Sequence, residues 1–258
     1  MSIKTDLAKE IIDGFSSPYA DVKNFLYGKT EITEVLIKTK ADENLIGKPK
    51  GRYVTVESDF IKNPFDNFDE EVSAIAHELR RMLPEKGDIL AVGIGNESLA
   101  ADSLGPLSAK MLFCGEFFER RLFSLVPGVE GKTGADPAVL IKAAAEALNP
   151  SAIVAIDSLA SNDISHICKT VQLSDAGILP GSGAGRAKSP ITKESMGLSV
   201  IAVGTPTVSA YRDEKSFVVP TEGEALIKRA ARLIFASLEL AVFPKFGIDF
   251  IKELAAFC

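Results

Sequence analysis

The stretch ILAVGIGN, residues 89–96, decides the fold class of this chain. Its first four residues are all apolar, which is typical of a parallel strand covered on both faces. Gly93 and Gly95 follow at once, and two glycines so close together suit a tight turn at the end of a strand. We therefore predict a buried strand over residues 89–92, then a turn, then a helix that begins near residues 103–104.

The same strand-and-helix unit recurs along the chain. Further apolar strands are predicted at residues 122–126, 152–156 and 200–203, and further helices at residues 67–83, 137–149 and 221–234. Such alternation indicates an α/β fold with a doubly wound, largely parallel sheet flanked by helices. The alternating segments at residues 32–38 and 52–57 predict a small β-rich N-terminal addition. The whole chain, residues 1–258, is expected to be a single domain.

Three of the predicted helices carry capping signals at their first turn. These signals are Asn67 with Glu70, Asp136 before Pro137, and Thr221 with Glu224. The segment at residues 172–190 is rich in glycine and serine, and we expect it to be a functional loop inside the domain.

The bulk composition narrows the function classes. With 46% hydrophobic and 25% charged residues, the chain resembles ordinary soluble proteins that fold without metal or disulfide bonds. The formal net charge of -6 argues against a generic nucleic-acid-binding surface, which would be basic. No signal peptide or membrane-spanning run is visible, and three widely spaced cysteines fit a reducing compartment. We therefore expect a cytoplasmic protein without direct nucleic-acid or membrane partners.

Two carboxylates lie where an open α/β sheet binds its ligands, outside the carboxyl ends of the strands. Asp157 directly follows the strand at residues 152–156, and Asp102 lies in the loop after the strand at residues 89–92. If these strands are neighbours, both side chains point into one crevice. Two close carboxylates can divide acid and base duties because they resist ionising together. A helix cap or a solvated loop residue is an equally good interpretation of either aspartate from spacing alone.

Other patterns give weaker signals. The Gly93 and Gly95 turn lacks the third glycine of a dinucleotide-binding fingerprint, so a tight turn explains it better. His77 falls opposite the apolar stripe of its helix and is expected at the surface. His166 lies in a polar stretch and is more often a loop residue than a ligand in such a setting. Metal-binding and phosphate-binding motifs are absent from the sequence, and we expect no cofactor and no metal.

Several motifs resemble those of the spore germination protease family. They are GIGN (93–96), DSLGPL (102–107), PGVEGKTG (127–134), AIDSLA (155–160), SDAGI (174–178), PGSG (180–183) and VIAVGTPT (200–207). They keep the family's order over most of the chain. The resemblance implies an atypical aspartic endopeptidase with a hydrogenase maturation protease-like fold, whose two essential aspartates fall on Asp102 and Asp157.

The resemblance also implies biological properties. Members initiate the degradation of small acid-soluble spore proteins during germination, in the cytoplasm of the spore core. They are usually homotetramers made as zymogens that process themselves near the N-terminus. KTDLAKE (residues 4–10) sets an acidic residue before an apolar one, as in the family's substrates. It implies a self-processing site between Asp6 and Leu7, on a terminus expected to be extended and flexible.

This chain departs from the family pattern in three places. The leader before Asp6 is very short, the variable segment around residues 212–216 is cut down, and Leu179 replaces a histidine that some relatives carry. Two other functions therefore stay open. One is a metal-dependent maturation endopeptidase of the hydrogenase-processing type, with His166 as a third ligand. The other is a non-catalytic spore protein that retains the fold.

Overall fold

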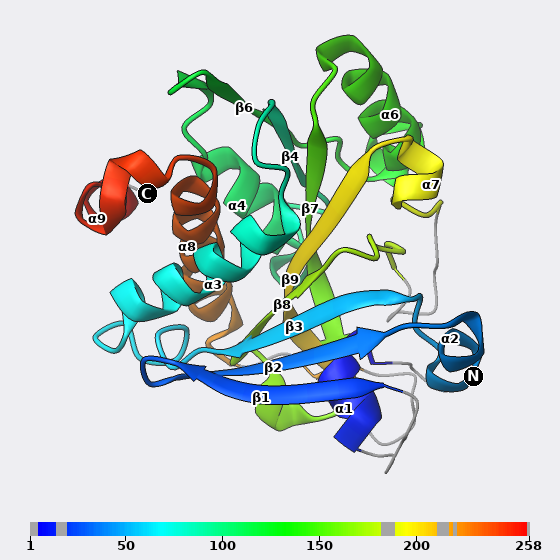
Figure 1. The fold of residues 1–258 in the computed structure, drawn as a ribbon, viewed down its shortest axis with the longest axis vertical. Helices are drawn as coiled ribbons and strands as arrows, with labels where there is room; N and C mark the ends of the chain where they lie inside the picture. The colour runs from blue at the N-terminus through cyan, green and yellow to red at the C-terminus, as the bar shows by residue number, and fades with distance from the viewer. Residues whose placement is uncertain (1–4, 14–19, 182–188, 211–216, 219–220, 257–258) are drawn as a thin grey trace.

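A mixed β-sheet with helices on both faces forms the centre of the protein (Figure 1). The structure is a computed structural model that describes residues 5–13, 20–181, 189–210, 217–218 and 221–256. The sheet order is β1-β2-β3-β8-β9-β7-β4-β6-β5, and β10 pairs with β9. The strands are β1 (Asp21–Tyr27), β2 (Thr30–Ile37), β3 (Gly51–Glu57), β4 (Ile89–Gly93), β5 (Gly115–Phe117), β6 (Arg120–Leu125), β7 (Ala152–Ser161), β8 (Thr170–Ser174), β9 (Ser199–Ala210) and β10 (Phe217–Val218).

The prediction of a parallel sheet is confirmed for its centre. β6, β4, β7 and β9 run parallel to one another, and all four contain an apolar strand expected from the sequence. The expected N-terminal addition is an antiparallel extension of the same sheet rather than a separate unit. β8 makes this connection because it pairs with β3 on one side and β9 on the other. We had expected residues 172–190 to be a loop, but the first three of these residues belong to β8.

Alternate residues of the central strands face opposite helix layers. In β4, Ile89 and Ala91 join the larger apolar core, whereas Leu90 and Val92 join a second core on the other face. The larger core packs under α3 (Phe68–Met82), α4 (Leu104–Met111), α8 (Gly223–Val242) and α9 (Gly247–Ala256). The second packs under α6 (Pro137–Leu148) and α7 (Lys193–Met196). This alternation decides on which face each polar residue of the central strands projects.

A third, small core joins the N-terminal helices to the antiparallel part of the sheet. It contains Ala8 of α1 (Ala8–Asp13) with Val35, Ile37 and Tyr53, and Ile46 of α2 (Lys40–Ile46) packs against it. The remaining short helices are α5 (Glu130–Thr133), η1 (Ala100–Asp102), η2 (Ile164–His166) and η3 (Pro244–Phe246). In the parts of the chain that the structure describes, no helix is both long and apolar enough to cross a membrane.

One of the three predicted helix caps is confirmed. Asp136 Oδ1 accepts the Ala138 N–H at 2.9 Å, with Pro137 in the first turn. Asn67 makes no side-chain capping bond because its backbone is left-handed. The third prediction is also wrong, because Glu222 rather than Thr221 precedes the first turn of α8.

Candidate active site

Strand β7 is longer than its neighbour β4, and this difference exposes the site. Gly93, the last residue of β4, pairs with Ile156, and β7 continues beside β9 for five more residues. The sequence had predicted that Asp157 directly follows the strand, but in the structure it lies inside β7. Its side chain projects on the α6 face, because Ala155 on the same face joins the second core. Asp157 is 6% exposed, and its Oδ1 accepts the N–H of Ser158 at 2.8 Å.

Asp102 reaches the end of β7 from the opposite helix layer. It is the last residue of η1, the short turn between β4 and α4. Its Oδ2 accepts the N–H of Asn96 at 2.8 Å. Thr207 of β9 fixes the same turn, because its hydroxyl donates to the carbonyl oxygen of Ala101 at 2.6 Å. A backbone N–H after β4 and a side-chain hydroxyl of β9 thus help to fix where the Asp102 carboxylate lies.

Glycine lets the turn after β4 pack directly against β7. A Cβ on Gly105, in the first turn of α4, would lie 2.3 Å from the carbonyl oxygens of both Ile94 and Ile156. Any side chain at this position would therefore push α4 away from the sheet. Close packing of the backbone explains the glycines around β4, so a dinucleotide-binding fingerprint is not needed to explain them.

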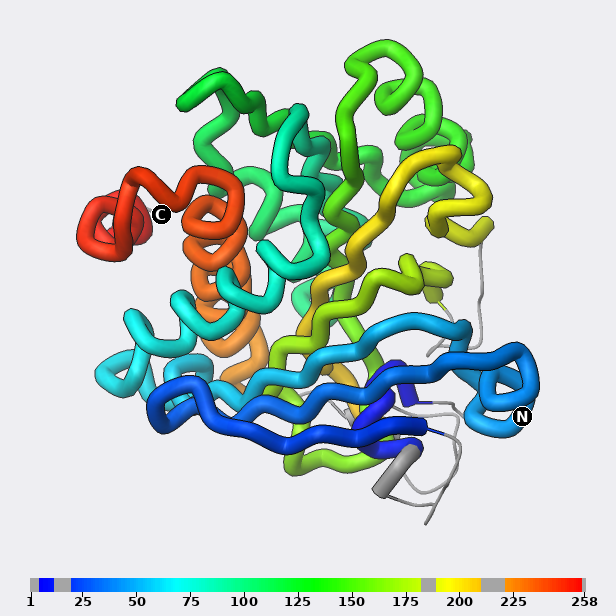
Figure 2. The backbone as a smooth tube through the Cα atoms, viewed as in Figure 1, coloured from blue at the N-terminus to red at the C-terminus, as the bar shows by residue number. Residues whose placement is uncertain are grey.

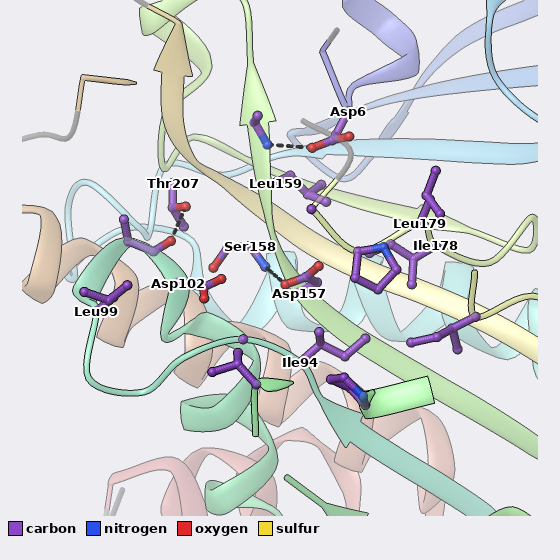
Figure 3. A pocket seen from close by; sticks show the side chains of 18 of the residues that line it. Asp6, Ile94, Leu99, Asp102, Asp157, Ser158, Leu159, Ile178, Leu179 and Thr207 are labelled. Carbon is purple, nitrogen blue, oxygen red and sulfur yellow. Dashed lines mark hydrogen bonds between the residues drawn. The ribbon is translucent and has the colours of Figure 1, made fainter. Parts of the chain in front are cut away.

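Asp102 and Asp157 line one cavity of about 470 Å³, which we call the aspartate cavity. Figure 3 shows the two carboxylates on either side of Ser158, as expected if both point into one crevice. Apolar side chains form much of the wall, and two of them are markedly exposed, Leu99 at 57% and Leu179 at 40%. The other apolar wall residues include Ile94, Val129, Leu159, Ile178 and Ile191. The cavity thus joins two carboxylates to a wall that suits apolar side chains.

Further polar residues line this cavity, and sequence reasoning did not place Asp136 or Ser158 there. Asp6 and Asp136 also line it, and Asp6 comes from the N-terminal segment. Ser158 lines it too, and its buried hydroxyl has no hydrogen-bond partner among the described residues. Ser158 directly follows Asp157 in the sequence. This position next to a candidate catalytic aspartate was the one sequence signal that could have pointed to it.

His166 does not join the two aspartates. Its Nδ1 lies 2.6 Å from Glu10 Oε1, and the ring lines a different cavity of about 310 Å³. His77 is half exposed, as expected. Among the described residues, no three His, Cys, Asp or Glu side chains are placed to hold a metal ion. Ser182 and Gly183 of the expected functional loop, and residues 212–216, lie outside the described residues.

Comparisons with known proteins agree with these motifs. A family model described as germination protease matches residues 9–219. The germination protease of Bacillus pumilus is 35% identical over 235 residues, covering 80% of this chain and 63% of the relative. That of Priestia megaterium is 34% identical over 238 residues with the same coverage, and that of Clostridium perfringens is 32% identical over 228 residues, covering 80% and 70%. The chain thus spans about 63% of the length of the first two relatives.

A solved structure also resembles this chain. The NiFe hydrogenase maturation protease HycI from Thermococcus kodakarensis is 20% identical in sequence, with a TM-score of 0.42. The likeness covers 64% of this chain and 98% of that protein.

Proposed function

This chain belongs to the germination protease family, and from that premise we propose that it is an endopeptidase in which Asp102 and Asp157 hydrolyse the peptide bond. The observation that carries the proposal is the shared cavity of the two carboxylates at the carboxyl edge of the parallel strands. Such an edge is where open α/β sheets bind their ligands.

Two carboxylates are sufficient for the proposed chemistry. One, ionised, takes a proton from water as the water oxygen attacks the peptide carbonyl carbon. The other, protonated, gives a proton to the amide nitrogen as the carbon–nitrogen bond breaks. The products are a carboxylic acid and an amine, and the pair ends with one proton between them, as it began.

The substrates that we propose are small acid-soluble spore proteins, cleaved at the start of germination in the spore core. The apolar wall of the aspartate cavity supports a substrate with a large apolar residue near the bond that is cut. A homotetramer is proposed from the same family premise.

We also propose self-processing between Asp6 and Leu7. The bond lies in a segment that the structure describes, and Leu7 is only 1% exposed. The expectation of a flexible terminus was therefore wrong at this bond, because Leu7 is packed into the protein. Mass spectrometry of protein incubated at mildly acidic pH tests the proposal: cleavage leaves Leu7 as the new first residue.

Digestion of an acid-soluble spore protein tests the proposed activity. Asp102→Asn and Asp157→Asn keep the shape of each side chain but cannot exchange the proton, so each should lower kcat by about 100- to 10,000-fold. Asp69→Asn is the matched control, because Asp69 lies on α3 and pairs with Lys252 at 2.7 Å. A folded Asp157→Asn protein with near-normal kcat would remove Asp157 from the mechanism.

A further inference from the structure

The N-terminal segment, defined here as residues 6–8, is bound through its main chain. The N–H of Asp6 donates to the carbonyl oxygen of Ala160 at 2.8 Å. The carbonyl oxygen of Asp6 accepts from Gln172 Nε2 at 2.8 Å, and the N–H of Ala8 donates to Gln172 Oε1 at 2.8 Å. These bonds place residues 6–8 beside the end of β7 and the middle of β8, and Figure 2 shows the start of the chain crossing this part of the sheet.

The carboxamide of Gln172 acts like the main chain of a neighbouring strand. It binds the C=O of one residue and the N–H of the residue two positions later, the pattern that one residue of a parallel strand makes with its neighbour. Peptides that add to a sheet in this way are held by main-chain bonds, which any sequence can supply. Gln172 is therefore suited to binding a polypeptide, and not only this one.

The position of Gln172 relates it to the candidate catalytic residues. Gln172 is in register with Gly204 of β9, and Gly204 is in register with Asp157 of β7. The three residues form one row across the sheet, so the side chains of Gln172 and Asp157 project on the same face. Two strand spacings separate them, roughly 10 Å. Glycine places no side chain between them, and a Cβ there would lie 2.7 Å from Leu159.

The side chains of the bound segment meet three different environments. Asp6 Oδ2 accepts the N–H of Ala160 at 2.9 Å, and Oδ1 lies 3.8 Å from the ammonium of Lys48. Leu7 is 1% exposed, and Ala8 is fully buried in the third core, where close packing disfavours a larger side chain. The site thus selects an acidic residue, then a large apolar residue, then a small one.

We propose that Gln172, Ala160 and Lys48 form a binding site for peptides of acidic–apolar–small sequence, and that residues 6–8 occupy it in this structure. The site lies on the Asp157 face of the sheet, and Asp6 lines the aspartate cavity. Cleavage of a bound peptide would rest on the proposed function, whereas binding of the peptide does not depend on it. Gln172 and Lys48 are positioning residues, since the contacts described here are with the peptide segment.

Peptide binding tests the site without relying on hydrolysis. The probe is a fluorescein-labelled peptide Lys-Thr-Asp-Leu-Ala-Lys-Glu, the sequence of residues 4–10, measured by anisotropy. All proteins carry Asp157→Asn so that the peptide stays intact. Asp6→Ala removes a charged acceptor from the resident segment and should let the peptide bind about tenfold more tightly. Glu10 still anchors α1 in this variant, because it accepts the Asn162 N–H at 2.8 Å.

Two further substitutions identify the residue that binds the peptide. Gln172→Glu, added to Asp6→Ala, places an acceptor opposite the peptide carbonyl and should weaken binding about tenfold or more. Thr55→Val is the matched control, because Thr55 is the buried neighbour of Gln172 on β3. A peptide with Asn and Ser in place of Asp and Leu should also bind about tenfold more weakly. Equal affinity for the Gln172→Glu protein, or no saturable binding to the Asp6→Ala protein, would overturn the proposal.

Hydrogen exchange keeps the proposal testable if Asp6→Ala does not fold. In the otherwise unaltered protein the Ala8 amide should exchange slowly, and Gln172→Glu or a saturating amount of the unlabelled peptide should each speed its exchange about tenfold. An Ala8 amide that neither change affects would overturn the site. If the peptide binds as expected but the protein without Asp157→Asn does not cut spore proteins, the binding site stands and the proposed activity fails.

Discussion

A Cβ on Gly95 would lie 2.2 Å from the carbonyl oxygen of Asp102 and 3.0 Å from its Oδ1. Gly95 also has a φ of +124°, a backbone angle that residues with a side chain rarely adopt. The turn after β4 therefore holds the Asp102 carboxylate only while this position is glycine.

Gly95→Ala should abolish peptidase activity while leaving a folded protein. The new methyl group must displace the η1 turn, and with it the candidate catalytic carboxylate. Gly134→Ala is the control, because its φ is +73° but nothing lies within 4 Å of its Cβ position. Both variants should lose about 1–2 kcal/mol of unfolding free energy from backbone strain. Circular dichroism melts and a digestion assay separate the effects. Equal activity in the two variants would show that crowding of Asp102 is harmless.

Ser158→Ala should lower kcat by about tenfold to 100-fold with little change in KM. The Ser158 hydroxyl is free to donate to the oxygen that becomes negative as water attacks the carbonyl carbon. Thr205 is the matched control: it pairs with Ser158 across β7 and β9, and its hydroxyl also has no partner among the described residues, but it does not line the aspartate cavity. Thr205→Val should keep kcat. A loss of kcat in both variants would indicate a packing effect.

Glu239 should make the protein less stable as pH rises. Burial raises its pKa from 4.5 to about 7, so the folded state binds the proton more tightly than the unfolded state. Its contribution is fully present below pH 4.5 and is lost as pH rises to about 7. Glu239→Gln should remove this dependence, which amounts to at most about 3 kcal/mol. Urea unfolding at pH 4.5, 6 and 8 measures it, with exposed Glu224→Gln as the control. A pH profile unchanged by Glu239→Gln would contradict the assignment.

Exhaustive chelation should leave peptidase activity intact. The two aspartates lack a third His, Cys, Asp or Glu at ligand distance in the described ranges, and His166 is bound to Glu10 instead. Activity measured before and after dialysis against EDTA, with zinc and magnesium added back separately, tests this expectation. Activity lost on chelation and restored by one ion would favour the metal-dependent maturation endopeptidase.

The central strands and both candidate aspartates could be predicted because each depends on local signals. Runs of buried apolar residues mark β4 and β7; Asp157 directly follows the second run, and Asp102 lies in the loop after the first. β8 was missed because it is short and polar at alternate positions, and a loop-like segment follows it. Its role depends on pairing with β3, more than a hundred residues earlier, which no local pattern encodes.

The parts of the site that the sequence did not reveal depend on long-range contacts. Gln172 is the single glutamine of the chain, and nothing around it predicts a contact with residues 6–8. Asp6 could be named from the family resemblance, but its bond to Ala160 could not. Such contacts follow from how the sheet brings distant strand ends together, which only the folded chain determines.

The binding site of the N-terminal segment also constrains the order in which the chain folds. Besides nearer partners such as Lys48 and Glu57, residues 6–10 hydrogen-bond to groups that follow them by 151 to 166 positions, on and around β7, η2 and β8. α1 can pack on β2 and β3 once these strands have formed, but the main-chain bonds of residues 6–8 have no partners until β7 and β8 have emerged from the ribosome. Contacts so distant in sequence form late because a long loop must close first. The peptide-binding site and its resident segment therefore meet only late in folding, and a nascent chain from which Gln172 has not yet emerged carries the segment without this binding site.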